Sequence, residues 1–186
     1  DAIMATAAQH EGAGLQVLAS DAARRAAAAL VAEGDALQWA DPRWRRELAA
    51  WMHPRRRGDG LSVPALALPL AHAVVRTFDI GHGVGAKDQQ LADASPLLLV
   101  IGTAGDRERH WLAAGQALER VLLLACTHGL QASYLNQPVQ VAALRPRLQQ
   151  LLDHPGHAQV LLRIGYPTDT LPPAPRRALA DVIETP

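Results

Sequence analysis

The chain has 186 residues, of which 49% are hydrophobic and 19% are charged, so it can bury a sizeable core and is not a disordered chain. Its eighteen acidic and eighteen basic residues cancel, which argues against a nucleic-acid partner, because proteins that bind duplex DNA usually carry a basic excess. Cys126 is the only cysteine, which excludes an internal disulfide and a cysteine-rich metal site. No stretch reaches the roughly 18 uncharged apolar residues of a membrane span, so no membrane partner is expected.

The first half of the chain, residues 1–94, is predicted to contain helices and loops. The prolines between Leu61 and Phe78 indicate a loop with one short helix, which could form a lid. The glycines at 81–85 indicate a mobile loop that lacks the Gly-Lys-Ser/Thr of a phosphate-binding loop. The remaining predicted elements are a helix over 2–10, a strand over 15–19, a helix over 22–39, and a helix that Asp41 caps and Pro42 begins.

The second half, residues 95–186, has a clearer pattern. Two continuous apolar runs predict strands that are buried on both faces. Asp106 is expected to cap a long helix, which has an apolar face from Trp111 to Ala125 and ends at Gly129. The order of elements indicates an α+β fold with a mixed central sheet. The predicted elements besides the long helix are strands over 96–102, 132–135 and 159–165, a turn over 136–138 and a helix over 141–152.

Several segments of this half, taken in order, carry a resemblance to a known family. They are SPLLLVIGT, WLAAGQALERVLLLACTHGLQASYLNQP, ALRPRLQQLL, QVLLRIGYP and PPAPRRALADVI. Together they resemble the C-terminal half of the nitroreductase family of FMN-dependent oxidoreductases, and most closely its Acg-like branch, in which one chain carries two nitroreductase-like halves. The resemblance is specific over 95–182 and weaker over 1–94, where the run Asp41 to Trp51 and the Asp59-Gly60 loop also match. It implies a three-layer nitroreductase-like fold, with a mixed central sheet around a long central helix.

The resemblance also implies a site for FMN where two such units meet. Family members bind the FMN phosphate through a basic residue after the last core strand, which falls here on Arg176 or Arg177. They place backbone groups beside the flavin N5 from a loop that corresponds here to Leu135, Asn136 and Gln137. A planar guanidinium suits a phosphate dianion, and the flavin itself carries the redox step, so no catalytic side chain is assigned. No metal site is expected, because the histidines are scattered.

The implied function is that of an FMN-dependent NAD(P)H oxidoreductase, which reduces nitro compounds or quinones by ping-pong hydride transfer. Two alternatives stay open: a protein that binds or sequesters flavin with little turnover, and a structural half that completes a catalytic partner. Residues 1–94, with the possible lid, and the nitroreductase-like core over 95–186 are expected to form one domain together.

The chain starts at Asp1 in what resembles the middle of a helix, and it lacks the arginine-rich opening of typical family members. We therefore expect this domain to be the C-terminal part of a longer chain. It would pair with a preceding N-terminal half or form a homodimer through the helix 111–125. A cytoplasmic location is expected, and export is possible because a signal peptide would lie in the preceding part.

Overall fold

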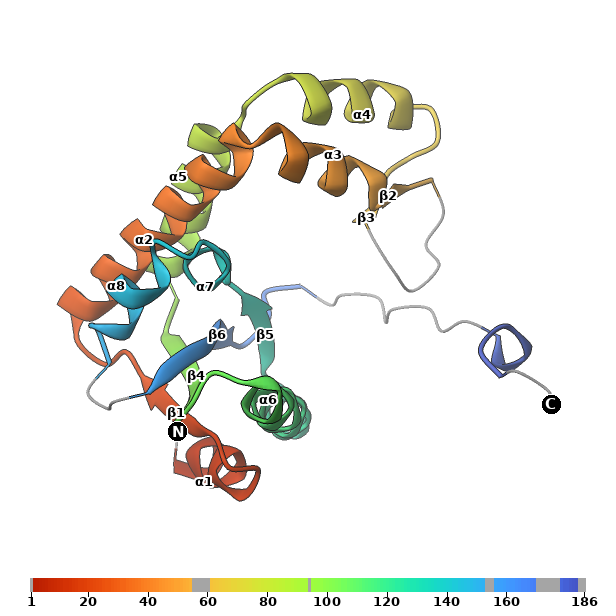
Figure 1. The fold of residues 1–186 in the computed structure, drawn as a ribbon. Coiled ribbons are helices and arrows are strands. Elements are labelled where there is room, and N and C mark those ends of the chain that lie inside the picture. The colour runs from red at the N-terminus through yellow and green to blue at the C-terminus, as the bar shows by residue number, and fades with distance from the viewer. Residues whose placement is uncertain (1, 55–60, 94, 153–155, 170–177, 184–186) are drawn as a thin grey trace. The chain divides into compact units, whose positions relative to one another are not determined.

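The structure is a computed structural model that describes residues 2–54, 61–93, 95–152, 156–169 and 178–183 (Figure 1). The chain forms two compact units. The first comprises Asp1–Leu37 and Gly81–Thr168, and the second comprises Gln38–Ile80 and Asp169–Pro186. The first unit contains a sheet with helices on both faces, and the second contains short helices and a two-stranded ribbon.

The sheet of the first unit has four strands in the order β1, β4, β6, β5, and every described pairing is antiparallel. The prediction of a mixed sheet is therefore wrong in this detail. The order strand, helix, strand does make β4 and β5 parallel to each other, but the last strand, β6, lies between them and runs opposite to both. The strands are β1 (Gly14–Val17), β4 (Leu97–Thr103), β5 (Gln131–Tyr134) and β6 (His157–Gly165).

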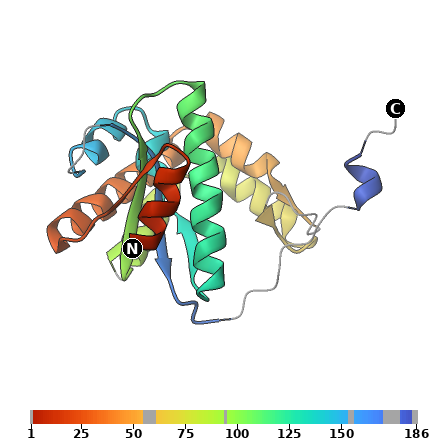
Figure 2. The same cartoon turned by 90° about the horizontal axis from the view of Figure 1, so that it is seen from below.

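Side chains that alternate along β4 divide the core of the first unit into two clusters. Leu99 and Ile101 pack with helices α1 (Ala2–His10) and α6 (Glu108–Thr127) on one face of the sheet. Leu98 and Val100 pack on the other face, mainly with helix α2 (Asp21–Ala40). Figures 1 and 2 show the sheet between these groups of helices. The predicted α+β class with three layers is confirmed.

Helix α6 differs in part from its prediction. Ala114, Ala117, Val121 and Ala125 are buried, and their small side chains allow the helix to lie close to the sheet. Leu112, which was expected on the same packed face, is 71% exposed. The helix ends as predicted, with Gly129 in the left-handed conformation at φ 70°.

The start of α6 also differs, because the expected cap, Asp106, lies before the N-cap residue Arg107. Its carboxylate instead accepts hydrogen bonds from Arg145 and Trp111. The Asp106 carboxylate was predicted to accept hydrogen bonds from the helix backbone. It binds Arg145, which is 39 residues away in the sequence.

The glycine-rich segment 81–85 is helical, so the prediction of a mobile loop is wrong. It forms the first turns of α5 (Gly81–Asp93). A Cβ atom at Gly85 would lie 2.9 Å from the backbone oxygen of Ala32, so glycine permits α5 to approach α2 closely. The predicted helix over 141–152 is shorter than expected and divides into turns and α8 (Arg145–Gln149), which has Pro146 in its first turn.

The second unit contains helices α3 (Pro42–Ala50) and α4 (Leu68–Thr77), the parallel strands β2 (Met52–His53) and β3 (Leu61–Ser62), and the 3-10 helix η1 (Leu179–Asp181). The predicted cap of α3 is confirmed, because Asp41 accepts a hydrogen bond from the N–H of Arg43 at 2.8 Å. The rings of Trp39 and Trp44 pack edge to face, with centroids 5.3 Å apart. Within the described ranges, no helix combines the length and the apolar character that a membrane crossing requires.

Candidate functional site

The turn that follows β5 is fixed against the central strand β6. The N–H of Leu135 donates to the carbonyl oxygen of Leu161 at 2.9 Å. The Asn136 side chain accepts, through Oδ1, a hydrogen bond from the N–H of Leu161 at 2.9 Å. The carbonyl and the N–H of Leu161 thus both bind the turn. The side chain of Leu135 is buried in the core.

Helix α2 fixes the same turn from a second side. Gln137 is the first residue of α7 (Gln137–Gln140), and its Nε2 donates to Oδ1 of Asp35 at 3.2 Å. A Cβ atom at Gly34 would lie 2.6 Å from the Cβ of Gln137, so only glycine allows this approach. Sequence reasoning missed Gly34 and Asp35, although a glycine inside an alanine-rich helix can signal a close contact.

These contacts leave one backbone donor of the turn available. No described residue accepts a hydrogen bond from the N–H of Asn136, which precedes the first turn of α7. The side chains of Asn136 and Gln137 are half-buried. Strand β6 and helix α2 therefore hold the turn in place, and the N–H of Asn136 can donate to an acceptor atom of a ligand.

The structure brings Leu135, Asn136 and Gln137 together in this turn, as the resemblance implied, and their contact with a cofactor stays a prediction. The two arginines expected at the phosphate, Arg176 and Arg177, lie outside the described residues. Strand β6 ends at Gly165 and leads toward them along the chain.

A polar network joins the start of α6 to α8 and β6. Arg145 binds both carboxylate oxygens of Asp106, at 2.7 and 3.0 Å, and its Nε donates to the carbonyl of Ala158. The Arg145 hydrogen bonds, with those from Trp111 and Gln159, hold the pKa of the Asp106 carboxyl well below its ordinary value. The charged side chains satisfy one another, so this network is structural.

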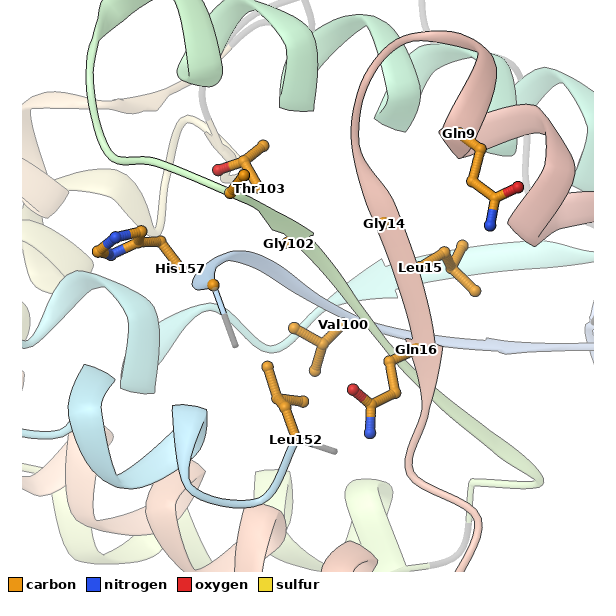
Figure 3. Close-up of a pocket in the computed structure, with 11 residues that line it drawn as sticks. Gln9, Gly14, Leu15, Gln16, Val100, Gly102, Thr103, Leu152 and His157 are labelled. Atoms are coloured by element: carbon orange, nitrogen blue, oxygen red, sulfur yellow. The ribbon is translucent and has the colours of Figure 1, made fainter. Parts of the chain in front are cut away.

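A small pocket lies between β1 and the end of β4 (Figure 3). Its volume is about 230 Å³, and Gln9, Gln16, Thr103 and His157 supply its polar side chains. Typical ligand pockets measure about 300–1,000 Å³, and no arginine or lysine lines this one. It therefore does not suit a phosphorylated cofactor. In the part of the chain that the structure describes, no three His, Cys, Asp or Glu side chains group to hold a metal ion.

Proteins of Mycobacterium tuberculosis are similar in sequence to this chain. The protein named "Putative NAD(P)H nitroreductase Rv3131" is 34% identical over 167 residues, which cover 85% of this chain and 48% of that protein. The uncharacterized protein Rv3127 is 28% identical over 152 residues, which cover 77% of this chain and 43% of that protein. The chain thus spans about half the length of these relatives. No protein-family model matches the chain.

Solved structures of nitroreductases share the fold. A nitroreductase with bound FMN from Bacteroides fragilis aligns with a TM-score of 0.52 at 12% identity, over 98% of this chain and 83% of that one. The FMN and NADPH-dependent nitroreductase NfnB from Sphigopyxis sp. strain HMH aligns with a TM-score of 0.54 at 19% identity, over 100% of this chain and 87% of that one. At these identities the likeness establishes the fold. The chain therefore adopts the fold of these nitroreductases, and it is similar in sequence over most of its length to a protein named as a putative NAD(P)H nitroreductase.

Proposed function

We propose that this chain is a flavin-binding unit of an FMN-dependent NAD(P)H oxidoreductase of nitroreductase type. The observation that carries the proposal is the turn from Leu135 to Gln137, which joins β5 to α7 and is called the β5–α7 turn below. Its side chains are tied to β6 and α2, while the N–H of Asn136 has no acceptor among the described residues. The proposal also draws on the mycobacterial relative that is named as an NAD(P)H nitroreductase, and on structural neighbours whose names include FMN.

The residues of the turn fit one edge of a flavin ring. The ring nitrogens of an oxidised flavin accept hydrogen bonds, and the free N–H of Asn136 can donate one. Arg176 and Arg177 are proposed to hold the phosphate, because a guanidinium fork binds phosphate oxygens in pairs. When bound, FMN would supply the redox chemistry that links NAD(P)H to a nitro compound or quinone. The chain's own task is to orient the ring and restrict the access of water.

We further propose that α6 packs against a second nitroreductase-like unit, which is either another copy of this chain or another part of a longer protein. The outer face of α6 supports this, because Trp111 is 51%, Leu112 71% and Leu123 60% exposed. The chain spans most of a single nitroreductase in the structural alignments but about half of each mycobacterial relative. That difference is the one expected if the relatives carry two units, as in the Acg-like branch.

Oligomeric state tests the pairing. Light scattering of the purified chain should give a dimer at micromolar concentration, and Leu112→Glu should give a monomer, because a charge would enter an apolar contact. Leu70→Glu adds the same charge at an exposed leucine of α4 and serves as the matched control. A wild-type monomer would contradict pairing between copies of this chain.

One feature favours the alternative in which flavin is bound with little turnover under a lid. Helix α4 and the segment before it expose Leu66 at 99% and Leu70 at 69%, so apolar side chains there are available to cover a ligand. The two functions differ in turnover. Steady-state NAD(P)H oxidation with a nitroaromatic compound and a quinone supports the enzyme, whereas bound FMN without oxidation by any acceptor supports storage.

A further inference from the structure

Strand β6 carries an arginine where its sequence is otherwise apolar. Arg163 lies in the run Val160 to Ile164, in one of the two internal strands of the sheet. Its direct cross-strand partners are Leu98 of β4 and Ser133 of β5, both uncharged. A cation in the centre of a sheet is costly unless a partner compensates it.

The side chain of Arg163 lies on the same face of the sheet as the β5–α7 turn. Leu98 and Leu161 belong to the core on the α2 side, and Arg163 shares that face because it opposes Leu98 and lies two residues after Leu161. Leu161 is the residue that holds the turn through both of its backbone groups. Arg163 is therefore about 7 Å along the strand from the anchor of the turn.

Among the described residues, this guanidinium has no anionic partner. The Nε atom of Arg163 is buried and has no hydrogen-bond partner, and no carboxylate of the described residues forms an ion pair with it. Two other arginines show how a guanidinium in this protein is usually paired. Arg145 binds the carboxylate of Asp106, and Arg45, which is buried, donates to the carbonyl of Trp39. Arg163 has neither arrangement, so its donors remain for a ligand.

We propose that Arg163 is an anion-binding residue of the flavin site and that its partner is an anionic oxygen of bound FMN. This inference rests on the function proposed above. FMN carries anionic oxygens at its phosphate and, once reduced, at the N1–C2 edge of its ring. Arg163 lies along β6 between the β5–α7 turn and the strand end at Gly165, and the experiments below distinguish these two oxygens as its partner.

Titration of the full chain with FMN and with riboflavin tests the proposal and distinguishes the two oxygens. Arg163→Gln should weaken FMN binding by about 10- to 100-fold, because a charge-assisted hydrogen bond is lost. Weakened binding of oxidised FMN together with unchanged riboflavin affinity would assign Arg163 to the phosphate. Unchanged oxidised-state affinity with a lowered reduction potential of bound FMN would assign it to the ring edge. Arg25→Gln removes the same charge at an exposed position of α2 and should leave both ligands within twofold.

A second measurement needs no flavin and separates failure of this inference from failure of the proposed function. Inorganic phosphate, compared with chloride at equal ionic strength, should raise the unfolding midpoint of the wild-type chain and of Arg25→Gln, but not that of Arg163→Gln. Arg163→Lys keeps the positive charge but lacks the planar guanidinium, so phosphate should raise its unfolding midpoint by less than that of the wild-type chain. This variant keeps the test informative if Arg163→Gln fails to fold.

The results distinguish failure of the proposed anion site from failure of the proposed function. If the wild-type chain binds FMN and Arg163→Gln binds it equally well in both redox states, the inference is overturned and the proposed function stands. If the wild-type chain binds no flavin, the proposed function fails for these residues. The phosphate experiment then decides alone, and an equal response of wild type and Arg163→Gln overturns the anion site.

Discussion

Replacing Gly34 with alanine tests whether the close approach of α2 holds the β5–α7 turn in place. The new Cβ atom would lie 2.6 Å from the Cβ of Gln137 and 3.0 Å from its carbonyl carbon. Ordinary contact begins near 3.4 Å, so the turn and the helix must separate by about 0.8 Å. We expect this overpacking to cost about 1–3 kcal/mol. The same substitution gains up to about 1 kcal/mol of helix propensity, which partly hides the cost.

Gly83→Ala is the matched control for Gly34→Ala. Gly83 lies in helix α5, and a Cβ atom there meets nothing within 4 Å. Both variants gain helix propensity, so the difference between their urea unfolding free energies reports mainly the overpacking. We expect Gly34→Ala to be about 1–3 kcal/mol less stable than Gly83→Ala.

The same pair of variants reports on function. A displacement near 1 Å can slow a positioned reaction by about 100-fold, so reduction of bound FMN by NAD(P)H should slow by about 10- to 100-fold in Gly34→Ala and stay unchanged in Gly83→Ala. Stopped-flow absorbance near 450 nm follows the reduction. Equal stabilities and equal rates in the two variants would show that the turn tolerates the shift and does not depend on the close approach of α2.

Three further predictions concern the packing of α5, the Asp106 network and the turn. Gly85→Ala should destabilise the chain by about 1–3 kcal/mol in urea unfolding, since its Cβ would meet Ala32 at 2.9 Å; a neutral result would contradict the close helix contact. Arg145 depresses the pKa of Asp106 in the folded state, so its stabilisation is present above about pH 4 and is lost as the pH falls below that value. Asp106→Asn should therefore flatten the fall of the unfolding free energy below pH 4, and an unchanged acid slope would count against the ion pair. Asn136→Ala should cost about 1–3 kcal/mol and weaken FMN binding, because a β6 amide loses its acceptor; wild-type stability would show that water replaces it.

The sequence predicts the elements whose signal is local. The apolar runs that became β4 and β6 are buried on both faces, and a continuous apolar run is the local mark of such strands. Asp41 caps α3 and Gly129 follows the end of α6, because both roles depend only on adjacent backbone groups. The turn over 136–138 was predicted from its residues, and the family resemblance supplied the expected role of Leu135, Asn136 and Gln137 beside the flavin.

The errors concern features that depend on distant residues. Asp106 was predicted to cap the helix, but its carboxylate binds Arg145 instead. Arg145 is 39 residues away in the sequence, so the residues around Asp106 give no sign of this partner. The glycines at 81–85 were interpreted as flexibility, whereas Gly85 serves a contact with α2. The sheet order could not be derived from the order of elements, because β6 inserts between β4 and β5. Arg163 could have been noticed as a charge within an apolar run.

Titration of the purified 186-residue chain with FMN, followed by absorption between 300 and 550 nm, shows whether these residues form a flavin site. We expect a saturable change in the flavin bands near 370 and 450 nm, which is retained in Gly83→Ala and weakened in Gly34→Ala. A spectrum that stays that of free FMN at every protein concentration would contradict the claim that these residues form a flavin site.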